Sequence, residues 1–297
     1  MNRRRAAEAA LIFNTLIWGA TFVLVKTALL DISPILFIAL RFSLATAALL
    51  VFFRGSAIPS GEPGRTWRSA GAGALAGTFL FLGYLLQTLG LRLTSAPRSA
   101  FLTGLTSAAV PLLAALVYRV RPQISEVVGV LIATAGLAIM TLPAVLGPMR
   151  LGDLLTVCCA VAFAAHIVTL GHFTEKMSYQ VLSVTQIGVA AVLGWALFSW
   201  VEKPQLAWRP AVLWAILITG LFATALAFSI QAWAQKYTSS ARTALIFMLE
   251  PVVAWITSYC LVGEGLSGRA AAGAALILSG VLIVELKPLN ARQHQFQ

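Results

Sequence analysis

The chain has 297 residues, of which 59% are hydrophobic and only 10% are charged, whereas soluble domains carry roughly 25% charged residues. This small number of charges cannot cover the surface of a soluble protein of this size. The composition therefore excludes an ordinary soluble domain and favours a protein embedded in lipid. The formal charge of +11 comes from Lys and Arg residues scattered between apolar runs, a pattern typical of membrane topology and not of a nucleic-acid-binding surface.

The first apolar segment follows a basic N-terminus, Arg3-Arg4-Arg5, an order that also occurs in cleaved signal peptides. The apolar run from Ala9 to Leu30 is longer than the core of a signal peptide, and no small-residue cleavage pattern follows it. The segment is therefore predicted to be a first transmembrane helix that is retained.

Ten segments are long and apolar enough to cross a bilayer, which needs about 20 mostly apolar residues per helix. The sequence therefore predicts an all-α integral membrane protein of ten transmembrane helices, with no folded soluble domain between them. The helix within 154–173 is expected to be the least hydrophobic because it holds His166 and His172. The predicted spans are residues 9–29, 34–53, 69–91, 96–118, 123–142, 152–172, 178–200, 209–233, 239–262 and 267–286.

The basic residues predict the orientation of these helices. With the N-terminus inside, thirteen Lys and Arg residues fall in cytoplasmic segments and seven in outer segments, while Arg41 lies within a helix. Positive charge is enriched on the cytoplasmic side of membrane proteins. We therefore expect a multi-pass protein of the cell inner membrane with both termini in the cytoplasm.

An internal repeat relates the two halves of the chain. A shift of 144 residues aligns Thr94-Ser95-x-x-Arg98 with Thr238-Ser239-x-x-Arg242 without a gap. It also aligns further uncommon residues, in the pairs Gln87–Gln231, Gly129–Gly273 and Gly136–Gly280.

The shift places helix one on helix six and helix five on helix ten. Because five is an odd number, the second copy must cross the membrane in the opposite direction to the first. We expect two inverted five-helix repeats around a central cavity, residues 1–143 and 144–287, followed by a cytoplasmic tail of residues 288–297. Inverted repeats of this kind recur in secondary transporters, whose solute site lies near mid-membrane, although some channels also have them.

Three short motifs occur in order along the chain: Trp18-Gly19-Ala20-Thr21-Phe22, Arg41-Phe42, and Leu249-Glu250-Pro251-Val252 followed by Gly263-Glu264. With this order and spacing the chain resembles the EamA-type branch of the drug/metabolite transporter superfamily over residues 10–286. Within that branch it is most similar to the YddG-type exporters of aromatic and other neutral amino acids. The resemblance implies efflux from cytoplasm to periplasm through a cavity lined by helices one to three and six to eight. Helices four, five, nine and ten would support that cavity from outside.

One position departs from the family pattern. Members often repeat the proline of helix nine in helix four, but here that place holds Ser107, and the nearest proline is Pro111. The two halves are therefore expected to bend differently.

Helices three and eight each place polar and aromatic residues on one face, at spacings of three and four. Facing a wet cavity satisfies the two symmetry-related glutamines, and so does polar packing between helices; we favour the cavity. The candidates for substrate binding are Phe81, Tyr84, Gln87 and Thr88 on helix three, and Phe228 and Gln231 on helix eight.

Helix one has a similar stripe, and helix six holds a histidine at membrane depth. Aromatic walls bind neutral or aromatic solutes by stacking, although core packing explains single aromatic residues equally well. His166 is a candidate for substrate contact or proton relay, and a structural histidine is the alternative. The further candidates for substrate binding are Asn14, Trp18, Thr21, Phe22 and His166.

Two charged residues within helices have two interpretations each. Arg41 can pair with a substrate carboxylate as a planar fork, but the Arg-Phe pair recurs in family members with different substrates, so we favour a structural role. Glu250 is a candidate for proton coupling, as is His166; the alternative for Glu250 is a structural role beside Pro251, which frees backbone groups.

These observations predict a secondary carrier that exports small neutral or aromatic amino acids and functions as a monomer in the lipid bilayer. The alternative is a carrier of other small metabolites or drugs with the same fold. The sequence has no phosphate-binding loop, no catalytic cluster, and no metal-ligand spacing at Cys158, Cys159 or Cys260. We therefore expect no enzymatic activity, no cofactor, no metal and no nucleic-acid partner, while uniport and proton antiport both remain open.

Overall fold

The computed structural model describes residues 3–55, 63–94, 96–119, 122–142, 148–174, 176–262 and 267–286. The predicted Gly263-Glu264 motif and the tail at 288–297 lie outside these ranges, and the side chain of Phe22 is likewise not described. The helices are α1 (Arg3–Ala28), α2 (Pro34–Phe52), α3 (Pro63–Leu93), α4 (Ala96–Gly104), α5 (Thr106–Tyr118), α6 (Ile124–Thr141), α7 (Leu151–Thr174), α8 (Tyr179–Val201), α9 (Pro210–Gly220), the π-helix η1 (Leu221–Leu226), α10 (Ala227–Ala234), α11 (Ser240–Phe247), α12 (Glu250–Val262) and α13 (Gly268–Glu285).

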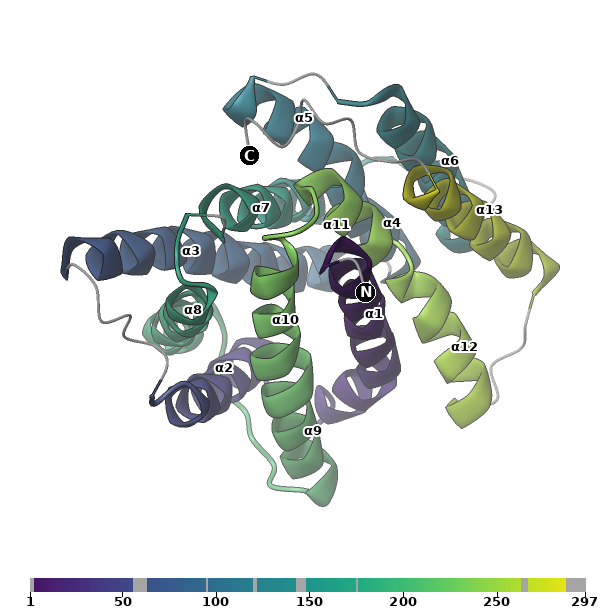
Figure 1. The fold of residues 1–297 in the computed structure, drawn as a ribbon. Coiled ribbons are helices and arrows are strands. Elements are labelled where there is room, and N and C mark those ends of the chain that lie inside the picture. The colour runs from purple at the N-terminus through teal and green to yellow at the C-terminus, as the bar shows by residue number, and fades with distance from the viewer. Residues whose placement is uncertain are drawn as a thin grey trace.

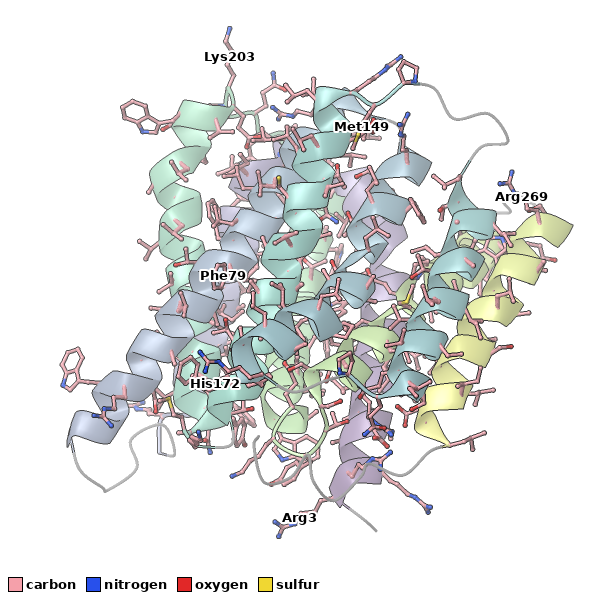
Figure 2. All side chains as sticks on the ribbon, turned by 90° about the horizontal axis from the view of Figure 1, so that it is seen from above. Arg3, Phe79, Met149, His172, Lys203 and Arg269 are labelled. Atoms are coloured by element: carbon pink, nitrogen blue, oxygen red, sulfur yellow. The ribbon has the colours of Figure 1, made fainter. Side chains whose placement is uncertain are left out.

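The described helices confirm an all-helical membrane protein. Nine of the spans they form are long and apolar enough to cross a bilayer, and α1 adds a helix of 26 residues. Figure 2 shows Lys203, Met149 and Arg269 near one end of the bundle and Arg3 at the other. The expectation that residues 154–173 form the least hydrophobic span is wrong, because Leu151–Thr174 has a mean hydropathy of 2.1 against 1.5 for Ser240–Cys260.

Three of the predicted spans are broken. The fourth span divides into α4 and α5 at Leu105, the eighth contains η1, and the ninth divides into α11 and α12 just before Glu250. Adding the 144-residue shift to the first break gives 249, the residue before α12. The fourth and ninth spans are therefore interrupted at equivalent positions. The two halves match at this break but differ at η1, which has no counterpart in the continuous helix α3.

The break before α12 has a local cause and a partner. The ring of Pro251 removes a backbone donor from the ladder of the helix, and the N–H of Met248 bonds to the carbonyl of Leu245 at 3.1 Å. An α-helix would instead pair this N–H with Ala244, whose carbonyl accepts the Ser107 hydroxyl of α5 at 2.7 Å. The serine that stands where family members have proline thus ties the two broken spans together.

Helices from the two halves pack in matching pairs. In Figure 1, α6 and α13 lie side by side at one edge of the bundle, and α1 lies between α10 and α12. Elsewhere α3 packs on α7, and α2 packs on α8. In predicted span numbers, the pairs are five with ten, one with eight, three with six, and two with seven.

Glycines bring α6 and α13 into backbone contact. A Cβ atom added to Gly136 would lie 2.6 Å from the carbonyl oxygen of Gly273, and one added to Gly129 would lie 2.7 Å from that of Gly280. The contacts are reciprocal, since added Cβ atoms on Gly273 and Gly280 would meet the same partners at 2.5 Å. Small residues allow membrane helices to approach this closely.

The N-terminus of α2 is capped by a side chain from the end of α8. The carboxylate of Glu202 accepts hydrogen bonds from the backbone N–H groups of Ile35 at 2.7 Å and Leu36 at 3.0 Å, which otherwise have no partner within the helix. It also forms an ion pair with Arg92 at 2.9 Å. A cavity of about 280 Å³ opens beside these residues, at the end of the bundle that carries Lys203.

Gly136→Ala is expected to lower the free energy of unfolding by about 1–3 kcal/mol, because the added methyl group overpacks the contact with Gly273. Gly71→Ala is the matched control: Gly71 lies in α3 with no atom within 4 Å of an added Cβ. It should leave stability unchanged or raise it by up to about 1 kcal/mol. Unfolding in detergent would measure both, and equal effects would contradict the α6–α13 contact.

Candidate functional site

Six aromatic side chains from both halves of the chain meet inside the bundle. Phe228 of α10 is the centre, with its ring 5.5 Å from Trp18 and 6.4 Å from Phe42 between centroids. Trp18 also meets Phe247 of α11 at 4.8 Å. We call the following residues the aromatic cluster: Trp18, Phe42, Tyr84, Phe163, Phe228 and Phe247.

The cluster is not closed on all sides. Phe42 and Phe228 are buried, whereas Trp18, Tyr84 and Phe247 are partly exposed. Tyr84 packs edge-on against Phe42 at 5.5 Å and Phe163 at 5.4 Å. Rings in this arrangement offer both faces and edges to an apolar or aromatic solute.

The π-helix η1 is the platform on which α1 and α2 rest. The Trp18 indole donates to the Ala223 carbonyl at 2.8 Å, and the Asn14 amide donates to the Ala227 carbonyl at 2.7 Å. From α2, Arg41 donates to the Thr224 hydroxyl. Wide π turns reposition carbonyls and often mark functional sites, and here Trp18 and Arg41 bind η1 itself while Asn14 binds Ala227, the first residue of α10 after it.

Among the predicted residues of helix one, Asn14 is fully buried and Trp18 lies in the aromatic cluster. The Thr21 hydroxyl bonds to its own helix, at 2.9 Å to the Ile17 carbonyl. Phe22 has no described side chain. Helix one thus contributes Asn14 and Trp18 to the site, and Thr21 has a partner that needs no ligand.

The predicted residues of helix three divide by burial. Phe81 is only 1% exposed and belongs to the core between α2, α3 and α8. Tyr84, Gln87 and Thr88 are partly exposed. The Gln87 amide makes a long hydrogen bond of 3.4 Å with Thr103 of α4, so much of its hydrogen-bonding capacity is available to another group.

The two symmetry-related glutamines have different surroundings. Gln231 is 1% exposed and donates to Gln235 of the same helix at 3.2 Å. Its carbonyl oxygen has no hydrogen-bond partner among the described residues, and the same holds for the carbonyl oxygen of Asn14. Buried polar atoms normally find a partner, so these two oxygens are candidate acceptors for a solute or water.

His166 forms a polar pair within the second half. Its Nε2 atom lies 2.8 Å from the carbonyl oxygen of Gln186 in α8, and its ring packs edge-on against Phe228 at 5.8 Å. This bond fixes the position of the imidazole against the cluster. The amide nitrogen of Gln186 has no further partner in the described part of the chain.

Glu250 lies closer to the cluster than the family resemblance implied. It follows the break after α11, whose Phe247 contacts Trp18. Glu250 is partly exposed and has no ion-pair partner among the described residues. The ninth span therefore enters the site instead of only supporting it from outside.

The repeated Thr-Ser-x-x-Arg block binds a carboxylate in each half. At one end of the bundle, Asp153 of α7 accepts the Thr94 hydroxyl at 2.6 Å and pairs with Arg98 at 3.1 Å. We call this set the outer clasp, since it adjoins Met149 at the end that carries Lys203 (Figure 2).

The second set lies at the end that carries Arg3. Glu8 of α1 accepts the Thr238 hydroxyl at 3.4 Å and pairs with Arg242 at 3.5 Å. Arg242 is fully buried and also lies 3.8 Å from Glu285 of α13. We call this set the inner clasp. Its residues correspond to those of the outer clasp through the 144-residue shift, with the carboxylate displaced by one position.

Sequence reasoning did not identify several of these contacts. The clasps could have been predicted, because the arginine of each repeated block needs a carboxylate as partner. A carboxylate, Glu8 or Asp153, stands near the start of the first helix of each half. Nothing in the sequence marks η1, and the pairing of His166 with Gln186 depends on packing between helices. Over the residues that the structure covers, no group of three or more His, Cys, Asp or Glu is placed to hold a metal ion.

Comparison with known proteins identifies the family. The model of the EamA-like transporter family matches residues 5–142 and again residues 150–286. An uncharacterized transporter of Archaeoglobus fulgidus is 32% identical over 96% of this chain and 87% of its own length. The uncharacterized transporter YyaM of Bacillus subtilis is 27% identical over 93% of each chain. A solved crystal structure shares the fold, with a TM-score of 0.79 at 18% identity over 95% of this chain and 97% of its own.

Asn14→Ala is expected to lower the free energy of unfolding by about 1–3 kcal/mol, because the buried carbonyl of Ala227 loses its donor. Thr21→Val, one helical face away, removes a hydroxyl that bonds only within its own helix and should stay within about 0.5 kcal/mol of the wild type. Unfolding in detergent compares the two variants. A neutral Asn14→Ala would mean that the packing of α1 does not depend on its bond to the start of α10.

Proposed function

Because the chain belongs to the EamA-like transporter family, we propose that it is a secondary carrier that exports small neutral or aromatic amino acids from the cytoplasm to the periplasm. The observation that carries this proposal is the aromatic cluster, whose rings are partly exposed at Trp18, Tyr84 and Phe247. Side-chain amide oxygens on the same helices, at Asn14 and Gln231, have no partner among the described residues. The rings can pack against an apolar side chain, and the amide oxygens can accept hydrogen bonds from an ammonium group. The candidate residues on helices one, three, six and eight remain predictions for solute contact.

The proposed carrier consists of two inverted halves, residues 1–143 and 144–287, with a cytoplasmic tail of residues 288–297. The two separate matches of the family model support a repeat. So do the glycines of α6 and α13: under the 144-residue shift, the contact of Gly129 with Gly280 becomes that of Gly273 with Gly136. A contact that maps onto itself in this way is expected of a two-fold axis between inverted halves.

The clasps support alternating access. One clasp lies at each end of the bundle. The inner clasp joins the start of α1 to the broken ninth span, and the outer clasp joins the start of α7 to the broken fourth span, its counterpart in the repeat. Opening the outer clasp would expose the cluster to one side of the membrane, and opening the inner clasp would expose it to the other. With the basic N-terminus in the cytoplasm, the outer clasp faces the periplasm of an inner-membrane protein that functions as a monomer.

A carrier of other small metabolites or drugs is the second candidate. The sequence argued against cationic drugs because helices one to three and six to eight lack an acidic residue at mid-depth. Glu250 weakens that argument, since it lies only three residues after Phe247 of the cluster. For an amino acid the same carboxylate can bind the ammonium group or couple transport to protons.

Proton coupling through Glu250 predicts that Glu250→Gln loses accumulation driven by a pH gradient but keeps exchange of solute.

Reconstituted protein is expected to accelerate the flux of labelled phenylalanine across liposomes, relative to liposomes without protein. Trp18→Ala should reduce this flux at least tenfold, because it removes a ring of the cluster and the bond to Ala223. Trp200→Ala is the matched control, since Trp200 is 86% exposed at the end of α8, and it should keep the flux of the wild type.

If labelled amino acids do not move while nucleosides, sugars or drug-like cations do, the second candidate function is correct. If Trp18→Ala and Trp200→Ala behave alike, the aromatic cluster is not the path of the solute.

A further inference from the structure

Arg41 is a buried cation in the middle of the site. It lies within α2, and only 6% of its surface is exposed. Its Nε and Nη2 atoms donate to the Thr224 hydroxyl of η1 at 3.0 and 2.8 Å. One neutral hydroxyl therefore accepts from one edge of the guanidinium, which carries five N–H donors in all.

The charge of Arg41 has no anionic partner among the residues that the structure describes. Over the described residues, no carboxylate lies within 4 Å of it, although Arg92, Arg98 and Arg242 each have one. An arginine buried in a protein normally pairs with a carboxylate, because desolvation of a lone cation is unfavourable. Of the two arginines that are buried in the described bundle, Arg242 lies beside carboxylates and Arg41 does not.

Aromatic rings take the place of the missing anion. The guanidinium carbon lies 5.9 Å from the ring centre of Phe37, 5.5 Å from that of Phe42 and 5.6 Å from that of Tyr84. Cation–π attraction stabilises a desolvated charge in part, and the Tyr84 hydroxyl is a further contact. These neighbours hold the guanidinium in place without neutralising it.

The position of Arg41 also suits a ligand. Phe42 and Tyr84 belong to the aromatic cluster, and Phe42 leads through its ring contact to Phe228. A solute whose apolar part lies on the cluster would therefore bring a carboxylate to Arg41. The planar fork of a guanidinium matches a carboxylate with two parallel hydrogen bonds.

We propose that Arg41 binds the carboxylate of the transported solute, so that the site selects molecules that carry a carboxylate beside an apolar or aromatic group. This inference rests on the proposed function of the same site. It replaces the interpretation, favoured from the sequence, that Arg41 is only structural. Thr224 is then a positioning residue that orients the guanidinium.

The test compares competitors that differ only in the carboxylate. In proteoliposomes that transport labelled phenylalanine, unlabelled phenylalanine should inhibit flux at least tenfold more strongly than phenylalaninamide. In Arg41→Gln the flux should fall at least tenfold, and the two competitors should become equal. Arg41→Lys keeps the positive charge but not the planar fork. Its flux and its preference for phenylalanine over the amide should therefore lie between those of the wild type and those of Arg41→Gln.

Arg209→Gln is the matched control, because the Arg209 side chain is 68% exposed and pairs with Asp31 at the surface. It should keep the tenfold preference. An Arg41→Gln protein that still prefers phenylalanine over its amide tenfold overturns the inference. If Arg41 variants do not fold, Thr224→Val serves instead: it should raise the KM for phenylalanine and reduce the preference, and an unchanged preference overturns the inference.

A second measurement separates this inference from the proposed function. Wild-type protein in detergent should be stabilised against heat by 3-phenylpropanoate but not by 3-phenylpropanamide, and Arg41→Gln or Thr224→Val should lose that difference. Absence of amino-acid flux together with this stabilisation would refute amino acids as substrates and retain Arg41 as a carboxylate site. Flux without any dependence on the carboxylate would refute the role of Arg41 alone.

Discussion

Hydrocarbon offers no hydrogen-bond partners, so each polar group inside this bundle must find one within the protein or within a solute. Most do: Ser107 binds the carbonyl left by the break in the ninth span, Glu202 caps α2, and the indole of Trp18 binds η1. This constraint makes the exceptions informative. Among the described residues, the side-chain carbonyl oxygens of Asn14 and Gln231 lack partners, and no carboxylate lies within 4 Å of Arg41. Asn14 and Gln231 stand on the same helices as Trp18 and Phe228 of the aromatic cluster, whereas other buried atoms without a partner, such as the hydroxyls of Thr134 and Thr174, lie in α6 and α7.

Polar contacts are distributed unevenly through the molecule. Toward its two ends, strong ion pairs in the clasps bind the leading helices to the broken spans. At the edge, glycine contacts join α6 to α13 with backbone almost touching backbone. In the interior, partly exposed rings and weaker bonds such as that of Gln87 with Thr103 prevail. A carrier whose halves rock around a solute needs close packing at its edge and contacts that close its two ends. It also needs an interior whose polar groups can still form hydrogen bonds.

The sequence predicted the helices because the bilayer requires segments of a certain length and hydropathy. It predicted the repeat because the two halves align at a shift of 144 residues, and it predicted three residues of the cluster, Trp18, Tyr84 and Phe228. It did not predict the roles of repeated residues. Gly129 and Gly136 aligned with Gly273 and Gly280 but touch them in the opposite order, an exchange that the proposed inversion of the repeat accounts for. Burial of Gln231 and the approach of Glu250 depend on breaks in two helices, which only Pro251 signalled. The sequence also did not show that aromatic rings, and no carboxylate among the described residues, surround Arg41.

Alternating access by two inverted halves is tested most directly by labelling the cluster from each side of the membrane. Thr88→Cys, in a protein whose three native cysteines are replaced, reports access to an impermeant maleimide in sealed vesicles of either orientation. Asp153→Asn, which breaks the outer clasp, should speed labelling from the periplasmic side and slow it from the cytoplasmic side. Glu8→Gln, which breaks the inner clasp, should do the reverse. Changes in the same direction for both variants would contradict two clasps that close opposite ends of one carrier.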